Sequence, residues 1–114
     1  MIKNSKIILT GGSGFIGTNA ADWMIKNNFD FINIDITPPK NIEHQPYWKN
    51  IDLTDYNDVF ELMKRYRPSH VLHLAADLGM DHKNLDDLQC NIKGLGNLIE
   101  ASNQIGSIQR IIFT

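Results

Sequence analysis

The 114-residue sequence predicts an α/β protein with a doubly wound parallel sheet, and three observations support this fold class. Short runs of β-branched and other apolar residues alternate with longer segments in which apolar residues recur at helical spacing. The connections between these segments are short and rich in glycine, proline and polar residues. Strands that alternate with helices in this way form parallel sheets, and right-handed crossovers place the helices on both faces.

Composition and charge indicate one globular domain without the marks of a nucleic-acid or membrane protein. Hydrophobic residues make up 42% of the chain and charged residues 21%, which is typical of a folded domain. The net charge of −2 provides no basic field to attract nucleic acid or an anionic membrane. No apolar run is long enough to span a membrane. Because Cys90 is the single cysteine, a disulfide framework is excluded, and we expect a cytoplasmic protein.

The first 35 residues predict a strand, a helix and a second strand. Lys6–Thr10 is a β-branched run that ends at a glycine cluster, as a buried strand does. Residues 14–28 carry apolar side chains at every fourth position, which is the stripe of an amphipathic helix. Phe31–Asp35 is the second apolar run, and Pro38 and Pro39 follow it as a stop signal.

The middle of the chain predicts a loop, two more strands and a second helix. Residues 37–46 hold three of the four prolines and indicate an irregular loop, and Trp48–Leu53 follows as the third strand. Thr54 is a suitable N-cap for a helix that ends before Pro68. Residues 69–76 then form the fourth strand.

A long helix and a fifth strand complete the expected elements. The helix runs from residue 85 to about residue 104, and Arg110–Thr114 is the strand. The helix is marked by Leu85, Leu88, Ile92, Leu95 and Ile99. Gly94 and Gly96 each weaken it by about 1 kcal/mol relative to alanine, so we expect close packing to compensate. A flavodoxin-like sheet, which uses similar elements in another strand order, stays open as the alternative architecture.

The strongest functional signal lies between the first strand and the first helix. Residues 10–17 read Thr-Gly-Gly-Ser-Gly-Phe-Ile-Gly, with glycines spaced for a tight turn, for approach of the backbone to a pyrophosphate, and for close packing of helix on strand. The amides at a helix N-terminus bind phosphate, and this helix has no carboxylate before Asp22. The pattern therefore predicts a dinucleotide-binding, Rossmann-like domain.

Asp35 ends the second strand, eighteen positions after Gly17. A carboxylate at this distance accepts hydrogen bonds from the ribose hydroxyls of the adenosine, and it repels a 2′-phosphate. The next residues are Ile36 and Thr37, so no Arg or Lys directly follows to pair with such a phosphate. The predicted cofactor is therefore NAD rather than NADP.

The glycine motif is similar to the opening fingerprint of the extended short-chain dehydrogenase/reductases, the NAD-dependent epimerase/dehydratase family. Three further motifs resemble that family in the same order: residues 52–55 (Asp-Leu-Thr-Asp), residues 71–76 (Val-Leu-His-Leu-Ala-Ala), and residues 91–101, which begin Asn-Ile-Lys-Gly. The resemblance covers essentially the whole chain. It implies a Rossmann-like domain over residues 1–114 that binds NAD, in an enzyme that acts on nucleotide sugars by transient hydride transfer.

The resemblance also implies a role for each matching position. The glycines form the phosphate loop, and the two residues before the last glycine present backbone N–H groups to the pyrophosphate. The loop glycines are Gly11, Gly14 and Gly17, and the two residues that present N–H groups are Phe15 and Ile16. The resemblance implies that Asp35 holds the adenosine ribose, and that Asp52 and Leu53 hold the adenine edge. Leu74, Ala75 and Ala76 flank the ribose and phosphate on the nicotinamide side, and Asn91 lies behind the reacting ring.

The remaining candidate residues favour structural roles. His73 lies inside the fourth strand and is expected to be a packed core residue rather than a base. Cys90 has no basic neighbour to activate it and is expected to be buried on its helix. The other histidines lack metal-ligand spacing with any acid or cysteine, so no metal site is predicted. Residues 77–82 stay unassigned, although residues 77–80 distantly resemble a loop of GDP-sugar epimerases.

The family's catalytic Tyr-x-x-x-Lys pair is absent, because no lysine lies four residues after Tyr47, Tyr56 or Tyr66. We therefore expect residues 1–114 to be the incomplete, cofactor-binding part of a longer nucleotide-sugar epimerase or dehydratase, which binds NAD but does not catalyse by itself. The family commonly dimerises through helices that include the one after the fourth strand, and the second of these helices is not in this sequence. A homodimer is a further expectation from the resemblance. A non-catalytic NAD-binding sensor and a unit for another adenine cofactor, such as S-adenosylmethionine, stay open as alternatives.

Overall fold

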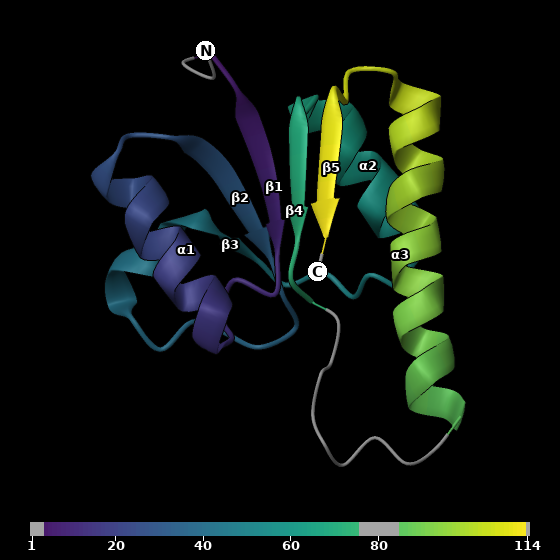
Figure 1. Cartoon of the computed structure of the whole chain (residues 1–114), viewed down its shortest axis with the longest axis horizontal. Coiled ribbons are helices and arrows are strands. Elements are labelled where there is room, and N and C mark those ends of the chain that lie inside the picture. Colours follow the sequence, from purple (N-terminus) through teal and green to yellow (C-terminus); the bar gives the residue numbers. More distant parts are fainter. Residues whose placement is uncertain (1–3, 76–84, 114) are drawn as a thin grey trace.

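A computed structural model describes residues 4–75 and 85–113, without the side chains of residues 85–88. Five parallel strands form one sheet in the order β3-β2-β1-β4-β5 (Figure 1). The strands are β1 (Lys6–Thr10), β2 (Asp30–Ile34), β3 (Trp48–Lys49), β4 (His70–His73) and β5 (Arg110–Phe113). The predicted α/β fold with a parallel sheet is confirmed.

The strand order distinguishes the two architectures that the sequence left open. β1 lies in the centre of the sheet, hydrogen-bonded to β2 on one side and to β4 on the other. The chain therefore builds outward from β1 to β3, returns to the centre, and builds the other half, which is the Rossmann strand order. A flavodoxin-like sheet would instead place β1 between β2 and β3. The Rossmann-like arrangement is confirmed.

Helices cover both faces of the sheet because side chains along each strand alternate in direction. The helices are α1 (Phe15–Lys26), α2 (Tyr56–Tyr66) and α3 (Leu85–Ile105), with a short 3-10 helix, η1 (Ile42–Tyr47). Ile7 and Leu9 of β1 pack in a core beneath α1, whereas Ile8 between them packs in a second core with α2 and α3. Figure 1 shows α1 apart from the α2–α3 pair accordingly.

The third strand is shorter than predicted, and the loop before it is more regular. β3 contains only Trp48 and Lys49, because its partner strand β2 ends at Ile34, opposite Lys49, and offers no further pairing. Ile51 and Leu53, which suggested a longer strand, pack against the core from the connection to α2 instead. η1 occupies part of the segment that was predicted to be irregular.

α2 begins one residue later than predicted and ends at the expected proline. Asp55 is the N-cap, and its carboxylate accepts a hydrogen bond from the Asp58 N–H at 3.3 Å. Thr54, the predicted N-cap, instead donates from its N–H and its hydroxyl to Asp52. At the other end Arg67, the residue before Pro68, is the C-cap with a left-handed φ of 52°, and its N–H donates to the Met63 carbonyl.

α3 packs through a face that differs from the predicted apolar stripe. From residue 89 onward, the buried side chains of α3 are those of Leu98, Ala101 and Ser102, whereas Ile92 and Ile99 are exposed. The bulky apolar residues are divided between two sides of the helix, and Leu98 and Ala101 pack in the core that α2 and the sheet share. Although α3 has 21 residues, neither it nor any other helix in the described ranges is apolar enough to cross a membrane.

The two glycines of α3 have different environments. A Cβ on Gly94 would lie only 3.1 Å from the Leu53 Cβ, so the absence of a side chain lets the helix approach the connection before α2. A Cβ on Gly96 would meet no atom within 4 Å. The prediction of close packing is therefore confirmed at Gly94 and wrong at Gly96, which lies on the exposed side with Ile92 and Ile99.

Candidate functional site

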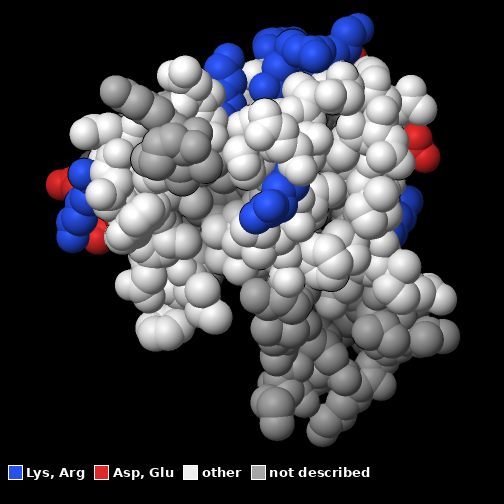
Figure 2. Space-filling view, turned by 45° about the horizontal axis from the view of Figure 1, so that its top comes forward, with Lys and Arg blue, Asp and Glu red and all other residues white. Residues whose placement is uncertain are grey.

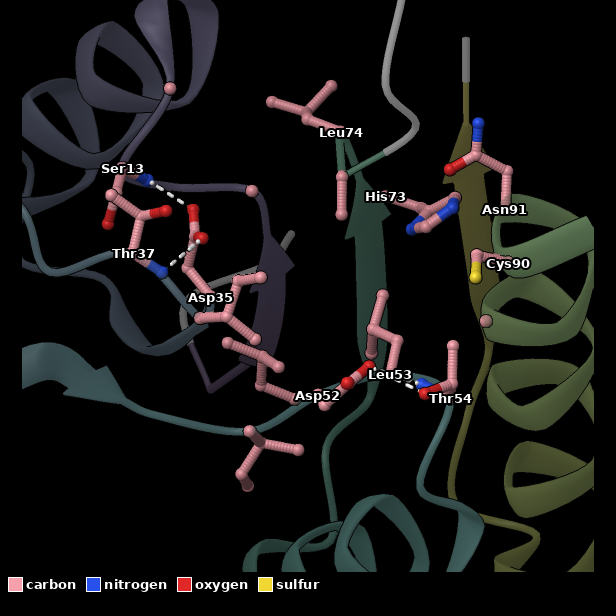
Figure 3. A pocket seen from close by; sticks show the side chains of 17 residues that line it. Ser13, Asp35, Thr37, Asp52, Leu53, Thr54, His73, Leu74, Cys90 and Asn91 are labelled. Atoms are coloured by element: carbon pink, nitrogen blue, oxygen red, sulfur yellow. Dashed lines mark hydrogen bonds between the residues drawn. The ribbon is translucent and has the colours of Figure 1, made fainter. Parts of the chain in front are cut away.

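A cleft of about 550 Å³ lies beyond the carboxyl ends of the strands. It is bounded by the β1–α1 loop, the ends of β2 and β4, the connection before α2, and the early part of α3 (Figure 3). Ligands of doubly wound folds bind at this position, where the strand order reverses. Eight of the predicted cofactor residues line the cleft: Gly11, Gly14, Asp35, Asp52, Leu53, Leu74, Ala75 and Asn91.

The glycine loop has no room for a side chain at two of its positions. Gly11 has a left-handed φ of 72°, and a Cβ there would lie 2.8 Å from the Ala75 backbone. A Cβ on Gly17 would collide with the Gly11 carbonyl oxygen. Gly14 differs, because a Cβ there would approach nothing closer than 3.4 Å and the residue borders the cleft. The first and last glycines therefore shape the loop, while the middle one leaves the cleft side open.

The N-terminus of α1 fits a phosphate group. The first turn contains no acidic residue, and the N-cap, Gly14, provides no side chain to the free amides. The first amides of an α-helix lack intrahelical acceptors and form the positive end of the helix dipole. Phe15, Ile16 and Gly17, also predicted as cofactor residues, belong to this turn rather than to the wall of the cleft. Ala76 lies outside the described residues.

The Asp35 carboxylate is fixed beside the glycine loop by two backbone amides. Its Oδ2 accepts a hydrogen bond from the Ser13 N–H at 3.0 Å, and its Oδ1 accepts one from the Thr37 N–H at 2.9 Å (Figure 3). The Asp35 carbonyl accepts from Trp48 Nε1 at 2.7 Å, which ties the end of β2 to β3. The half-buried carboxylate is therefore held in one orientation at the edge of the cleft.

A second wall of the cleft is formed by the connection before α2 and is fastened to α3. Asp52 Oδ1 accepts hydrogen bonds from the Thr54 N–H at 2.9 Å and from the Thr54 hydroxyl at 2.8 Å. The Leu53 carbonyl accepts from the Asn97 side-chain amide at 2.8 Å, beside the close contact of Leu53 with Gly94. α3 thereby positions the segment that resembles the adenine-binding motif, with Asp52 exposed at the cleft.

Thr10 and His73 join the carboxyl ends of β1 and β4 at the base of the cleft. Thr10 Oγ1 accepts from the N–H groups of Leu74 at 3.0 Å and Ala75 at 3.1 Å, so its own proton is donated to His73 Nδ1 at 2.7 Å. This pattern requires the neutral imidazole with its hydrogen on Nε2. His73 is only 5% exposed, and burial lowers its pKa below the usual 6.5. The prediction that His73 is a packed core residue is confirmed.

The environment of His73 predicts a loss of stability in mild acid. Because its pKa is lower in the folded chain, the unfolded chain binds a proton that the folded chain does not, and stability decreases as the pH falls below 6.5. We expect this group to contribute a slope of up to about 1.4 kcal/mol per pH unit. His73→Asn keeps an acceptor for Thr10 but cannot titrate, so urea unfolding between pH 7 and 5 should show a smaller slope. Equal slopes in the two proteins would contradict the assignment.

Two residues at the site were not anticipated. Cys90 is exposed and borders the cleft, so the prediction that it is buried is wrong. It lies beside Asn91 on the part of α3 that borders the cleft (Figure 3). Asn33 of β2 is buried and hydrogen-bonded to the glycine loop. Its signal in the sequence is an amide within an apolar strand, which requires a buried partner.

The described residues contain no metal site. No group of three or more His, Cys, Asp or Glu side chains within these ranges is arranged to hold a metal ion. No Lys or Arg is among the described residues that line the cleft either. An anion in the cleft would therefore bind to backbone amides at the N-terminus of α1. The Asp35 carboxylate is held beside these amides by the Ser13 N–H.

Sequence comparison identifies relatives along nearly the whole chain. The sequence profile of the NAD dependent epimerase/dehydratase family matches residues 7–114. CDP-paratose 2-epimerase of Salmonella typhi is 30% identical over 122 residues, which cover 96% of this chain and 36% of that protein. dTDP-glucose 4,6-dehydratase of Haemophilus influenzae is 35% identical over 109 residues, which cover 84% of this chain and 32% of that protein. The chain thus spans about a third of the length of these relatives.

Solved structures share the fold. The UDP-glucose 4-epimerase of Thermotoga maritima, solved with UDP-glucose, superposes with a TM-score of 0.82 at 28% identity, over 95% of this chain and 37% of that chain. The UDP-glucose 4-epimerase of Thermus thermophilus, solved with NAD, gives a TM-score of 0.78 at 28% identity, over 90% of this chain and 35% of that chain. The expected cofactor is also the one for which the family is named. The chain therefore belongs to the NAD dependent epimerase/dehydratase family.

Proposed function

We propose that the cleft binds NAD and that residues 1–114 are the cofactor-binding part of a nucleotide-sugar epimerase or dehydratase. The observation that carries this proposal is the presence, in one cleft, of an open helix N-terminus at Gly14 and a fixed carboxylate at Asp35. Backbone amides bind the anionic pyrophosphate, and the carboxylate accepts hydrogen bonds from ribose hydroxyls. Epimerases and dehydratases of nucleotide sugars among the relatives support the choice of substrate class.

Each half of the cofactor has a corresponding wall of the cleft. We assign the pyrophosphate to the loop of Gly11, Gly14 and Gly17 with the amides of Phe15 and Ile16. We assign the adenosine ribose to Asp35, and the adenine edge to Asp52 and Leu53. All three residues line the same cleft. On the nicotinamide side we place Leu74, Ala75, Ala76 and Asn91.

The charge distribution supports NAD over NADP. In Figure 2 many of the lysine and arginine side chains lie at the top of the view, with others near its centre and at both sides. Lys6 and Arg110, the first residues of β1 and β5, lie at the amino ends of the strands. The cleft lies at the opposite, carboxyl ends, and no Lys or Arg is among its described lining residues. A 2′-phosphate would therefore meet the Asp35 carboxylate, which two amides hold in place, without a cation to neutralise it.

The chain's own contribution to the reaction is to bind and orient the cofactor. When bound, NAD supplies the acceptor for a hydride from a sugar carbon. The sequence contains no Tyr-x-x-x-Lys pair to act as acid and base, so we expect this chain to bind NAD without converting a sugar. A non-catalytic NAD-binding sensor would use the same cleft. Conversion of a nucleotide sugar by the longer protein would exclude the sensor.

We also propose a homodimer that forms through α3. Ile92 and Ile99 lie on one side of this helix with Gly96 between them, and all three are exposed. Apolar side chains around a small residue allow two helices to approach closely. Sedimentation equilibrium of the chain, with Ile99→Lys as the comparison, tests this interface, and a monomeric wild-type chain would contradict it.

Removal of the Asp35 carboxylate tests the proposed cofactor site. We expect Asp35→Ala to weaken NAD binding by about 10- to 100-fold, the range for a lost hydrogen bond to a charged group. The preference for NAD over NADP should decrease at the same time, because the repulsion of the 2′-phosphate is removed. Titration calorimetry with both dinucleotides measures the two effects. Glu61→Ala, which removes an exposed carboxylate on α2, is the matched control and should bind NAD as the wild type does. Unchanged NAD affinity in Asp35→Ala would overturn the assignment.

A further inference from the structure

Asn33 is a buried amide near the carboxyl end of β2. It is 2% exposed and stands between Ile32 and Ile34 in the central part of the sheet, where it pairs with Leu9 of β1. An amide buried without hydrogen bonds destabilises a fold, whereas an aliphatic side chain of similar size would only add apolar contact. The side chain therefore has a role that an apolar residue would not fulfil.

Both polar atoms of Asn33 bind the glycine loop. Oδ1 accepts a hydrogen bond from the Gly12 N–H at 2.8 Å, and Nδ2 donates to Ser13 Oγ at 3.3 Å. The two partners are consecutive residues between β1 and α1. A Cβ on Gly12 would collide with the Asn33 side chain, so the amide occupies the space that this glycine leaves free. Gly12 is not one of the three glycines of the phosphate motif, and Asn33 explains why it is a glycine.

The contact with Asn33 determines what Ser13 presents to the cleft. Because Ser13 Oγ accepts a hydrogen from Asn33, its own hydroxyl proton is left to donate. The Ser13 N–H simultaneously donates to the Asp35 carboxylate. Ser13 borders the cleft, next to the carboxylate assigned to the adenosine ribose. Its hydroxyl is therefore a donor beside Asp35, which is an acceptor.

We propose that Asn33 is a positioning residue for the adenosine half of the dinucleotide. It fixes the peptide between Gly12 and Ser13 and orients the Ser13 hydroxyl as a donor to a ribose or phosphate oxygen. The proposal rests on the proposed function, because it names a group that prepares the same cleft. Asn33 itself does not reach the ligand and acts through the loop.

The first measurement is the affinity for ADP-ribose, which carries the adenosine half of NAD without the nicotinamide. We expect Asn33→Leu to raise the Kd by about 5- to 20-fold, as Ser13→Ala should also do. The Kd of the double variant should exceed the larger of the two single-variant Kd values by no more than about twofold, because both changes act through the same Ser13 hydroxyl. Fully additive losses would overturn the proposal.

A matched control separates positioning from a general loss of stability. Ser102→Ala removes another buried hydrogen bond, from Ser102 Oγ to the Leu98 carbonyl at 2.7 Å, in α3 and away from the loop. We expect this variant to lower the urea midpoint and to leave the Kd for ADP-ribose unchanged. If Asn33→Leu likewise lowers the urea midpoint but leaves the Kd for ADP-ribose unchanged, Asn33 has only a structural role and the proposal is wrong.

The second measurement, amide hydrogen exchange in the ligand-free chain, does not depend on the proposed function. The Gly12 N–H should be protected in the wild type and in Asn33→Asp, which keeps an acceptor, and should exchange rapidly in Asn33→Leu. Asn33→Asp should still bind ADP-ribose weakly, since Ser13 would then donate to the new carboxylate, and this variant carries the affinity test if Asn33→Leu does not fold. A wild-type chain that fails to bind ADP-ribose would refute the proposed function, while the exchange rates would still decide whether Asn33 orders the loop.

Discussion

Replacing Gly17 with alanine is expected to lower the free energy of unfolding by about 3 kcal/mol or more and to abolish NAD binding. The Cβ of alanine would collide with the Gly11 carbonyl oxygen and would lie 2.6 Å from the Gly12 Cα. Both are backbone atoms of the loop, so no side-chain rotation relieves the overlap. α1 would have to move away from β1, which disturbs the core that Leu9 and Met24 form between helix and sheet. Urea unfolding followed by circular dichroism measures the loss.

Gly14→Ala is the matched control, because it places the same methyl group three residues earlier. Gly14 has a φ of −80°, which alanine adopts without strain, and the nearest atom to its Cβ would be 3.4 Å away. We expect a stability loss of about 1 kcal/mol or less, the difference between glycine and alanine as an N-cap. The methyl group stands where the pyrophosphate is proposed to approach, so NAD affinity should fall at least about tenfold. Equal stability of the Gly17→Ala and Gly14→Ala variants would contradict the packing argument.

These glycines illustrate what the sequence alone could predict. Their spacing encodes backbone geometry directly, since a left-handed φ at Gly11 and a close contact at Gly17 both require the absence of a side chain. Lys6–Thr10 was predicted with the bounds that the structure has, because a β-branched run and a following glycine cluster mark both of its ends. Local signals of this kind, repeated along the chain, were sufficient for the fold class and for the place of the cleft.

Features that depend on distant partners could not be predicted in the same way. The length of β3 is set by the end of its partner β2 at Ile34. The apolar side chains of Ile51 and Leu53 indicate burial, but burial alone does not distinguish a strand from a loop that packs on the core. A helical period likewise does not tell which of two apolar sides meets the sheet, so the exposure of Cys90 and Ile92 was missed. Which side of α3 is buried is decided only when this helix packs on α2.

The packing of α3 gives the second large expected effect, a loss of about 2–5 kcal/mol in the free energy of unfolding for Leu98→Ala. Leu98 is fully buried in the core that Val59, Met63 and Val71 share, so truncation leaves a cavity between α3, α2 and β4. Typical domains are stable by only about 5–15 kcal/mol, and this loss is therefore a large part of the total. Leu98 also adjoins Asn97, which holds Leu53 at the wall of the cleft.

Ile99→Ala removes a side chain of similar size from the next position of the same helix and serves as the control. Ile99 is 42% exposed, so little apolar contact is lost, and the better helix propensity of alanine offsets part of that loss. We expect a change within about 0.5 kcal/mol. Urea unfolding at low protein concentration keeps any association through α3 from contributing. A loss in Ile99→Ala as large as that in Leu98→Ala would mean that the exposed side of α3, rather than its contact with α2 and β4, stabilises the chain.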